Sequence, residues 1–169
     1  MVRRTGPDVQ ELWRAVSRVL DPEVPALSVV DLGIVRDIRF EIDEVVVDVT
    51  PTYSGCPAMD VIEADIIAAL RRAGADRVTV RTVYQPAWTT DWLSDEAKAA
   101  LKEYGIAPPP STAGGTEELI PLGRRRQTIA CPFCGSLDTT VRSEFGSTAC
   151  KAICFCNACR QPFEYFRPL

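Results

Sequence analysis

Two pairs of cysteines near the carboxyl end of the chain have the spacing of a metal site. Two residues separate Cys131 from Cys134, and two residues separate Cys156 from Cys159. Each pair places two thiolates on a tight turn, and two such turns can present four sulfurs to one tetrahedral ion. The segment between the pairs is long enough for a hairpin that brings the second turn beside the first. The pattern predicts a zinc site, with iron as the open alternative.

The predicted four-thiolate site is structural rather than catalytic. An ion with four protein ligands has no open position for a substrate. A tail as short as residues 128–169 rarely has a sufficient apolar core without a metal. We therefore expect a metal-folded zinc ribbon over these residues.

Two further cysteines, Cys150 and Cys154, lie between the two pairs. The sequence has no export signal, and clustered thiols in a reducing compartment favour metal ligation over disulfides. For Cys154 we favour a small apolar residue of the ribbon sheet. For Cys150 two interpretations stay open, namely such a packing residue or a second functional thiol.

The seventh cysteine, Cys56, lies far from the others in the loop Ser54-Gly55-Cys56-Pro57. This loop leads into an expected helix, whose free N–H groups and dipole favour a thiolate, so we expect a functional thiol with a lowered pKa. Asp21, Glu23 and Asp31 all lie in one earlier loop. With Cys56 they could hold a transient metal or cluster, although solvation or capping accounts for the acids equally well.

The composition excludes several classes of protein. The chain contains no histidine, which excludes Ser-His and Cys-His catalysis and imidazole ligands. Its formal net charge of −4 argues against a general polyanion-binding protein. No apolar run approaches the ~20 residues that span a bilayer, and the N-terminus lacks a secretory signal. We expect a cytoplasmic protein with no membrane partner.

The hydrophobic pattern predicts an α+β fold. Apolar residues recur at helical or alternating spacing in the order helix, strand, strand, helix, strand, helix. The helices are expected at residues 7–20, 57–74 and from 95 to 104, and the strands at 38–42, 45–49 and 78–82.

The chain is expected to divide at a linker. Residues 106–127 are rich in Pro, Gly, Ser and Thr, including Pro108-Pro109-Pro110 and Gly114-Gly115. We therefore expect a first domain over residues 1–105, a linker over 106–127 and the ribbon over 128–169.

Three motifs of the first domain resemble a family of iron–sulfur cluster assembly factors, the MIP18/SufT-like proteins. They are Asp21-Pro-Glu-Val-Pro, Asp31-Leu-Gly-Ile-Val and Thr52-Tyr-Ser-Gly-Cys-Pro. The tail, with Phe145-Gly-Ser-Thr-Ala-Cys-Lys and the two cysteine pairs, resembles the PaaD subfamily, also called PaaJ. Together the two resemblances cover nearly the whole chain.

The resemblance implies an accessory protein of the phenylacetyl-CoA ring-1,2-epoxidase system of phenylacetate catabolism. Such a protein is expected to assist iron–sulfur maturation of the reductase component and not to be an enzyme itself. By the same resemblance Cys56 matches the family's single thiol, Glu23 and Asp31 match its acidic positions, and Cys150 matches the cysteine of the tail motif. The implied cofactors are zinc and a transient iron ion or iron–sulfur cluster.

Two other functions stay open at this point. The chain could be a structural subunit of the epoxidase complex that never binds an iron–sulfur cluster. It could also be a zinc-ribbon nucleic-acid binder that uses Arg124–Arg126, Arg142 and Lys151, although the acidic total counts against this. The sequence leaves the client protein and the oligomeric state open, including a homo-oligomer.

Overall fold

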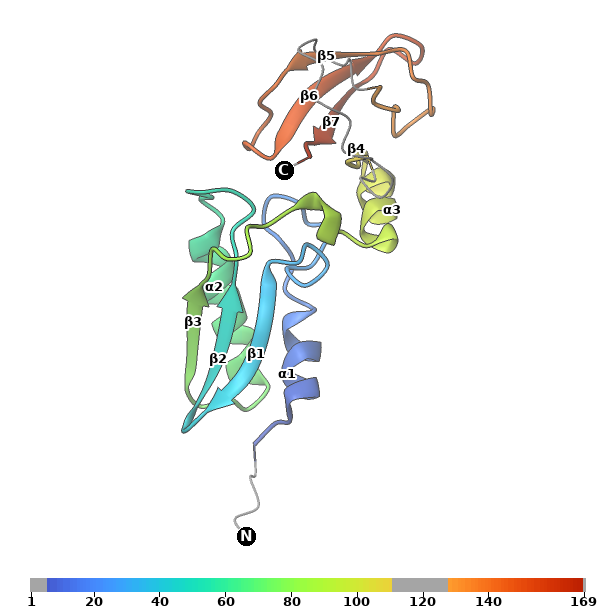
Figure 1. Cartoon of the computed structure of the whole chain (residues 1–169). Coiled ribbons are helices and arrows are strands. Elements are labelled where there is room, and N and C mark those ends of the chain that lie inside the picture. The colour runs from blue at the N-terminus through green and yellow to red at the C-terminus, as the bar shows by residue number, and fades with distance from the viewer. Residues whose placement is uncertain (1–5, 111–127, 169) are drawn as a thin grey trace. The chain divides into compact units, whose positions relative to one another are not determined.

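The computed structural model describes residues 6–110 and 128–168 and divides the chain into two compact units (Figure 1). The N-terminal unit comprises Met1–Trp88 and the C-terminal unit Thr89–Leu169. The α+β class predicted from the sequence is confirmed. Within the described ranges, no helix has the length and apolar character that a membrane crossing requires.

The N-terminal unit has the predicted order of helix, two strands, helix and strand. Strand β2 is the central strand, antiparallel to β1 and parallel to β3, and α2 forms the crossover between the two parallel strands. The elements are α1 (Val9–Val16), β1 (Val35–Glu41), β2 (Glu44–Val49), α2 (Met59–Arg72) and β3 (Val78–Thr82).

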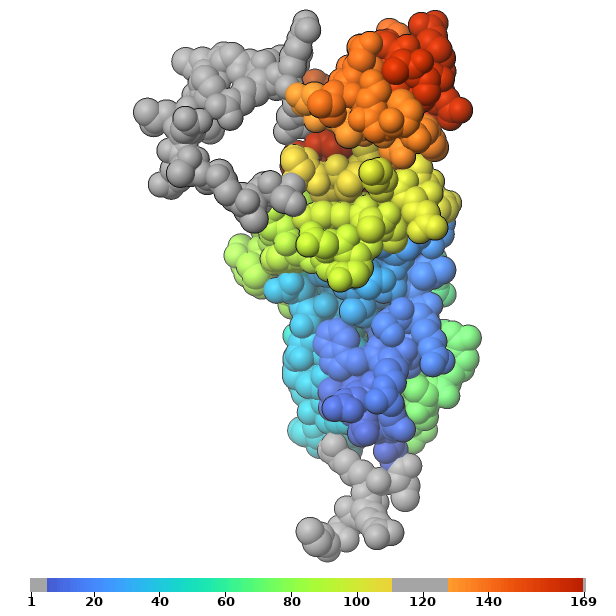
Figure 2. Space-filling view, turned by 90° about the vertical axis from the view of Figure 1, so that its right-hand side faces the viewer, coloured from blue at the N-terminus to red at the C-terminus, as the bar shows by residue number. Residues whose placement is uncertain are grey.

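The core of this unit lies between the sheet and its two helices. Both α1 and α2 lie on one face of the sheet, with α1 against β1, α2 against β3 and the two helices in contact with each other (Figure 1), and Figure 2 shows the side of the unit on which α1 is exposed. Alternate residues of β2 meet the buried stripes of the helices. The fully buried side chains include Leu12, Val16, Val47, Ile62, Ile66 and Leu70.

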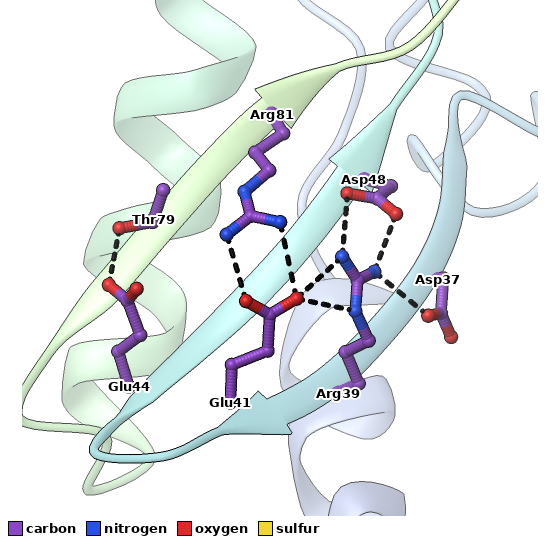
Figure 3. A network of polar contacts seen from close by, with 7 residues as sticks. All are labelled: Asp37, Arg39, Glu41, Glu44, Asp48, Thr79 and Arg81. Atoms are coloured by element: carbon purple, nitrogen blue, oxygen red, sulfur yellow. Dashed lines mark hydrogen bonds and ion pairs between the residues drawn. The ribbon is translucent and has the colours of Figure 1, made fainter.

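The opposite face of the sheet bears a network of charged side chains (Figure 3). Arg39 of β1 contacts Asp37, Glu41 and Asp48, and Arg81 of β3 pairs with Glu41 at 2.8 Å. These acids hold the pKa of the Arg39 guanidinium above its ordinary value. Such exposed pairs contribute little stability. Val46 of β2 pairs in register with Arg39 and Thr79, and it is fully buried on this charged face.

Helix α1 is shorter than the sequence predicts. It begins after Asp8, whose carboxylate accepts from the Glu11 N–H while the Glu11 carboxylate accepts from the Asp8 N–H. It ends at Val16 rather than near Leu20. The next residues leave the helix because their backbone pairs with the following loop, with the Val29 N–H donating to the Val19 carbonyl at 2.9 Å.

The C-terminal unit contains a four-stranded sheet in the order β4-β7-β6-β5. Strands β5, β6 and β7 form an antiparallel ribbon, and β4 pairs parallel to β7. The elements are the 3-10 turn Thr90–Trp92, α3 (Asp95–Tyr104), β4 (Ile106–Ala107), β5 (Thr139–Ser143), β6 (Lys151–Cys156) and β7 (Pro162–Phe166).

The division between the units differs from the predicted boundary at residue 105. The backbone pairing of β4 with β7 draws the preceding helix α3 into the C-terminal unit. Ala107 is buried in the same cluster as Cys131 and Cys156. Gly105 ends α3 with a φ of 95°, and a Cβ there would lie 3.2 Å from the Phe133 ring. Most of the predicted linker, residues 111–127, lies outside the described residues.

We predict that a fragment ending at Trp88 folds by itself, because it contains the whole three-stranded sheet and both of its helices. Urea unfolding followed by tryptophan fluorescence should show one cooperative transition. A fragment ending at residue 105 should unfold at the same urea concentration, since it adds α3 without the strand partners of β4. The division would be contradicted if the shorter fragment showed no cooperative transition. It would also be contradicted if the longer fragment unfolded at a clearly higher urea concentration.

Candidate functional site

The four cysteines of the two predicted pairs come together in the C-terminal unit. The sulfur atoms of Cys131, Cys134, Cys156 and Cys159 all lie within 4.8 Å of one another. The Sγ atoms of Cys131 and Cys159 are 3.7 Å apart, and those of Cys134 and Cys156 are 3.6 Å apart. Both of these short distances join one pair to the other, as expected when two turns face one shared ion.

The two cysteine turns have equivalent backbone geometry. In the first, the Gly135 N–H donates to the Cys131 carbonyl at 2.9 Å, and in the second the Arg160 N–H donates to the Cys156 carbonyl at 3.0 Å. The Cys131 and Cys156 N–H groups donate to the carbonyls of Ser136 and Gln161. Each turn thus projects its two sulfurs in the same way.

The donor set fits a divalent metal ion that prefers thiolates. The Cys159 N–H approaches the Cys156 sulfur at 3.5 Å and helps to hold the pKa of Cys156 at about 7. Burial raises the pKa of Cys159, and a cation beside this thiol would favour its ionised form. Four thiols at this spacing suit zinc, which these residues would hold with no open position.

Cys154 and Cys150 differ from these four thiols. Cys154 is fully buried in the ribbon core, and burial raises its pKa to about 11, as expected for a packing residue. Cys150 is also buried, and its sulfur lies 3.0 Å from the Thr148 hydroxyl. Neither sulfur belongs to the cluster of four.

Cys56 lies in the loop before α2 and is half-buried. The helix begins at Met59, and its N-cap residue, Ala58, makes no side-chain capping bond. The Cys56 thiol is therefore near a helix end without a side-chain cap, but not within the helix. Gly55 adopts a φ of 82° in this loop, a conformation that favours glycine.

The pKa of Cys56 is raised, and the lowered pKa expected from the sequence is wrong. Burial of the thiol is the largest cause, and the negative charges of Glu23 and Asp21 act in the same direction. Hydrogen bonds with the Ala58 backbone and the Tyr53 side chain favour the thiolate but are outweighed. The thiol is therefore mainly protonated at neutral pH.

The three acids of the earlier loop have different roles. Asp21 is buried and accepts from the N–H groups of Glu23 and Val24 at 2.8 and 2.7 Å, which fixes the loop. Asp31 accepts from the backbone and hydroxyl of Ser28. Glu23, half-buried, is close enough to affect the Cys56 thiol. The role of these acids toward a metal or cluster stays a prediction.

Sequence reasoning missed one residue of the Cys56 site. Tyr53 forms a hydrogen bond with the thiol, whereas Asp21, which affects the thiol through its negative charge, had been named from the sequence together with Glu23 and Asp31. The position of Asp21 before a proline is typical of a carboxylate that binds backbone N–H groups of its own turn. The sequence has no comparable signal for the position of Tyr53.

Both units match known protein families. Residues 9–82 match the model described as "Iron-sulfur cluster assembly protein", and residues 116–167 match the "PaaD zinc beta ribbon domain". A protein of Escherichia coli, named as a putative subunit of 1,2-phenylacetyl-CoA epoxidase, is 44% identical over 95% of this chain and 93% of its own length. The chain belongs to the PaaD family.

Other relatives match the N-terminal part of this PaaD-family chain. An "Fe-S protein maturation auxiliary factor" of Porphyromonas gingivalis is 32% identical over 54% of the chain and 89% of its own length. A crystal structure of a domain of unknown function from Bacillus anthracis has 29% identity and a TM-score of 0.50, over 54% of the chain and 89% of that domain. The N-terminal unit therefore corresponds to a domain that also exists without a ribbon.

We predict about one tightly bound zinc ion per chain, because four thiols converge on one closed site. Replacing any one of Cys131, Cys134, Cys156 and Cys159 by Ser should abolish stoichiometric zinc, measured by metal analysis after gel filtration. The same variants should lose the structure of the C-terminal unit alone. Cys56→Ser is the control and should retain its zinc. Full zinc content in any of the four ligand variants would refute the assignment.

We predict that Cys56 reacts slowly with iodoacetamide near pH 7 and faster as the pH rises past 9, because its pKa is raised. Glu23→Gln removes one negative charge that disfavours the thiolate and should shift the rate profile to lower pH. Asp43→Asn, a matched loss of charge at the exposed hairpin tip, should leave the profile unchanged. Mass spectrometry of the Cys56 peptide measures the rate. Equal profiles in all three proteins would show that Glu23 does not act on this thiol.

Proposed function

We propose that this chain is an accessory subunit of a phenylacetyl-CoA epoxidase system and assists iron–sulfur maturation of the reductase component. The full-length similarity to the E. coli protein named as a subunit of that epoxidase is the observation that carries the proposal. The match of the N-terminal unit to iron–sulfur assembly proteins supports the maturation role.

In this proposal the two sulfur sites have separate tasks. The four-cysteine site is closed and folds the C-terminal unit. The Cys56 thiol, half-buried in its loop, is the group that would contact iron as cargo. Because thiolate is the ligating form, binding of iron at Cys56 would release the proton that the raised pKa retains. The negative charge of Glu23, which disfavours the thiolate in the absence of a metal, would then attract the cation.

The chain would act beside the epoxidase subunits in the cytoplasm and would not itself perform epoxidation. Its task would be to deliver or protect iron or a cluster while the reductase folds around its centre. The name of the E. coli relative, as one subunit of the epoxidase, also fits a purely structural member of the complex. Replacing Cys56 distinguishes the two functions, because the maturation role requires this thiol and the structural role does not.

We predict that Cys56→Ser retains thermal stability and zinc but fails to support reductase maturation. The thiol is only half-buried, so its replacement by an isosteric hydroxyl costs little packing. Reductase purified from cells that produce the variant should contain several-fold less iron and sulfide than reductase from wild-type cells.

Cys150→Ser is the matched control for loss of a thiol, and it should leave the reductase loaded if Cys150 only packs. A fully loaded and active reductase in the Cys56→Ser background would contradict the maturation role and favour the structural one.

A further inference from the structure

The zinc ribbon presents an outward sheet face that its metal site does not use. Along β6 the buried residues Ala152, Cys154 and Cys156 alternate with Ile153 and Phe155. Ile153 is 38% exposed, and Phe155 is half-buried. The partner of Phe155 on β7 is the exposed Pro162. This face therefore combines apolar side chains with solvent access.

Two guanidinium groups lie against the ring of Phe155. The guanidinium carbon of Arg142, on β5, is 5.2 Å from the ring centroid, and that of Arg160, on the second cysteine turn, is 5.4 Å away. Both arginines are exposed, and in the described part of the chain no carboxylate forms an ion pair with either. Two guanidinium groups thus contact one ring, and neither is paired with a carboxylate of residues 6–110 or 128–168.

The neighbouring acid on this face, Glu164, already has binding partners within the ribbon. Glu164, opposite Ile153 on β7, binds the Lys151 ammonium at 2.9 Å and accepts from the Ser147 hydroxyl at 2.9 Å. Lys151 itself is buried by this pairing, which removes it from the exposed basic surface that the sequence suggested.

The backbone at Arg160 points to a role for its side chain. Arg160 has a φ of 64°, and the equivalent position of the first cysteine turn is Gly135, with a φ of 74°. Glycine adopts this conformation without strain, whereas a residue with a Cβ does not. A second glycine would therefore suit the turn itself better, and the arginine is explained by where it places its guanidinium.

We propose that Arg142, Phe155 and Arg160 form a docking surface for an acidic, partly apolar segment of a partner protein. Guanidinium groups bind carboxylates with two parallel hydrogen bonds, and ring contacts hold them in place before binding. Ile153 and Pro162 would contact the apolar side chains that lie between the carboxylates of the bound segment. The surface requires neither Cys56 nor a cluster, so it extends beyond the proposed maturation role.

A carboxylate-bearing segment fits this surface better than a nucleic acid does. The chain has a formal net charge of −4, and long-range attraction of a polyanion requires an excess of positive charge. Two guanidiniums against one ring match a short acidic segment rather than a phosphate chain that continues past them. Arg124–Arg126, the other basic group of the sequence, lie outside the described residues.

The test uses the zinc-loaded full chain and a fluorescein-labelled peptide of alternating glutamate and leucine, with binding measured by fluorescence anisotropy. The variants are Arg142→Gln and Arg160→Gly. The second variant gives the second cysteine turn a glycine, as the first turn has at Gly135. Each should retain wild-type zinc content and thermal stability and bind the peptide at least about fivefold more weakly, with binding that weakens as salt rises. Arg77→Gln, an equal loss of charge in the N-terminal unit, should bind as the wild type does.

Three results would overturn the docking surface. The wild type could fail to bind the peptide, the two variants could bind it as well as Arg77→Gln does, or a single-stranded oligothymidylate could bind instead and be lost in the variants. The last result would identify a nucleic-acid surface. Because none of these measurements involves iron or the reductase, they leave the proposed maturation role untouched, and failure of that role would leave this surface untouched.

Discussion

Four sulfurs within 4.8 Å of one another are the constraint on which the C-terminal unit depends. Ionised thiols at this spacing repel and buried thiols resist ionisation, so a bound cation would stabilise the four thiolates together. Structural zinc in small ribbons contributes about 10 kcal/mol or more to folding. Cys131 and Cys156 are fully buried members of the same apolar cluster as Ala107. A metal held by these cysteines would therefore support the ribbon and also the strand β4, which comes before residues 111–127 in the chain.

The fold of the N-terminal unit, in contrast, does not depend on a cysteine. Its fold rests on β2, which is hydrogen-bonded on both edges and covered by two helices, and Cys56 adds little to that core. The loop that contains Asp21 is instead fixed by carboxylate bonds to backbone N–H groups. Such a loop can keep its shape whether or not the thiol has bound anything. In our proposal, one chain combines a closed site for folding with a half-buried thiol, Cys56, for transient chemistry.

Most of this arrangement could be predicted from local sequence. The spacing of the four cysteines predicted their convergence, and alternation predicted β2 and β3 to within one residue, whereas β1 begins three residues earlier than predicted. The predictions that failed depend on long-range contacts. The end of α1 is set by pairing with residues 27–29, and α3 joins the ribbon because two residues, Ile106 and Ala107, pair with β7. The sign of the Cys56 pKa shift depends on burial and on carboxylates from a distant loop, which outweigh the nearby helix end.

The central claim is that this chain handles iron or a cluster through Cys56 on behalf of the reductase. The most direct test is anaerobic reconstitution of the purified chain with ferrous iron and sulfide, followed by mixing with apo-reductase and measurement of the reductase iron, sulfide and electron-transfer activity. The account predicts that the wild-type chain accelerates cluster appearance on the reductase and that Cys56→Ser, with full zinc, does not. Equal acceleration by both proteins, or by neither, would contradict it.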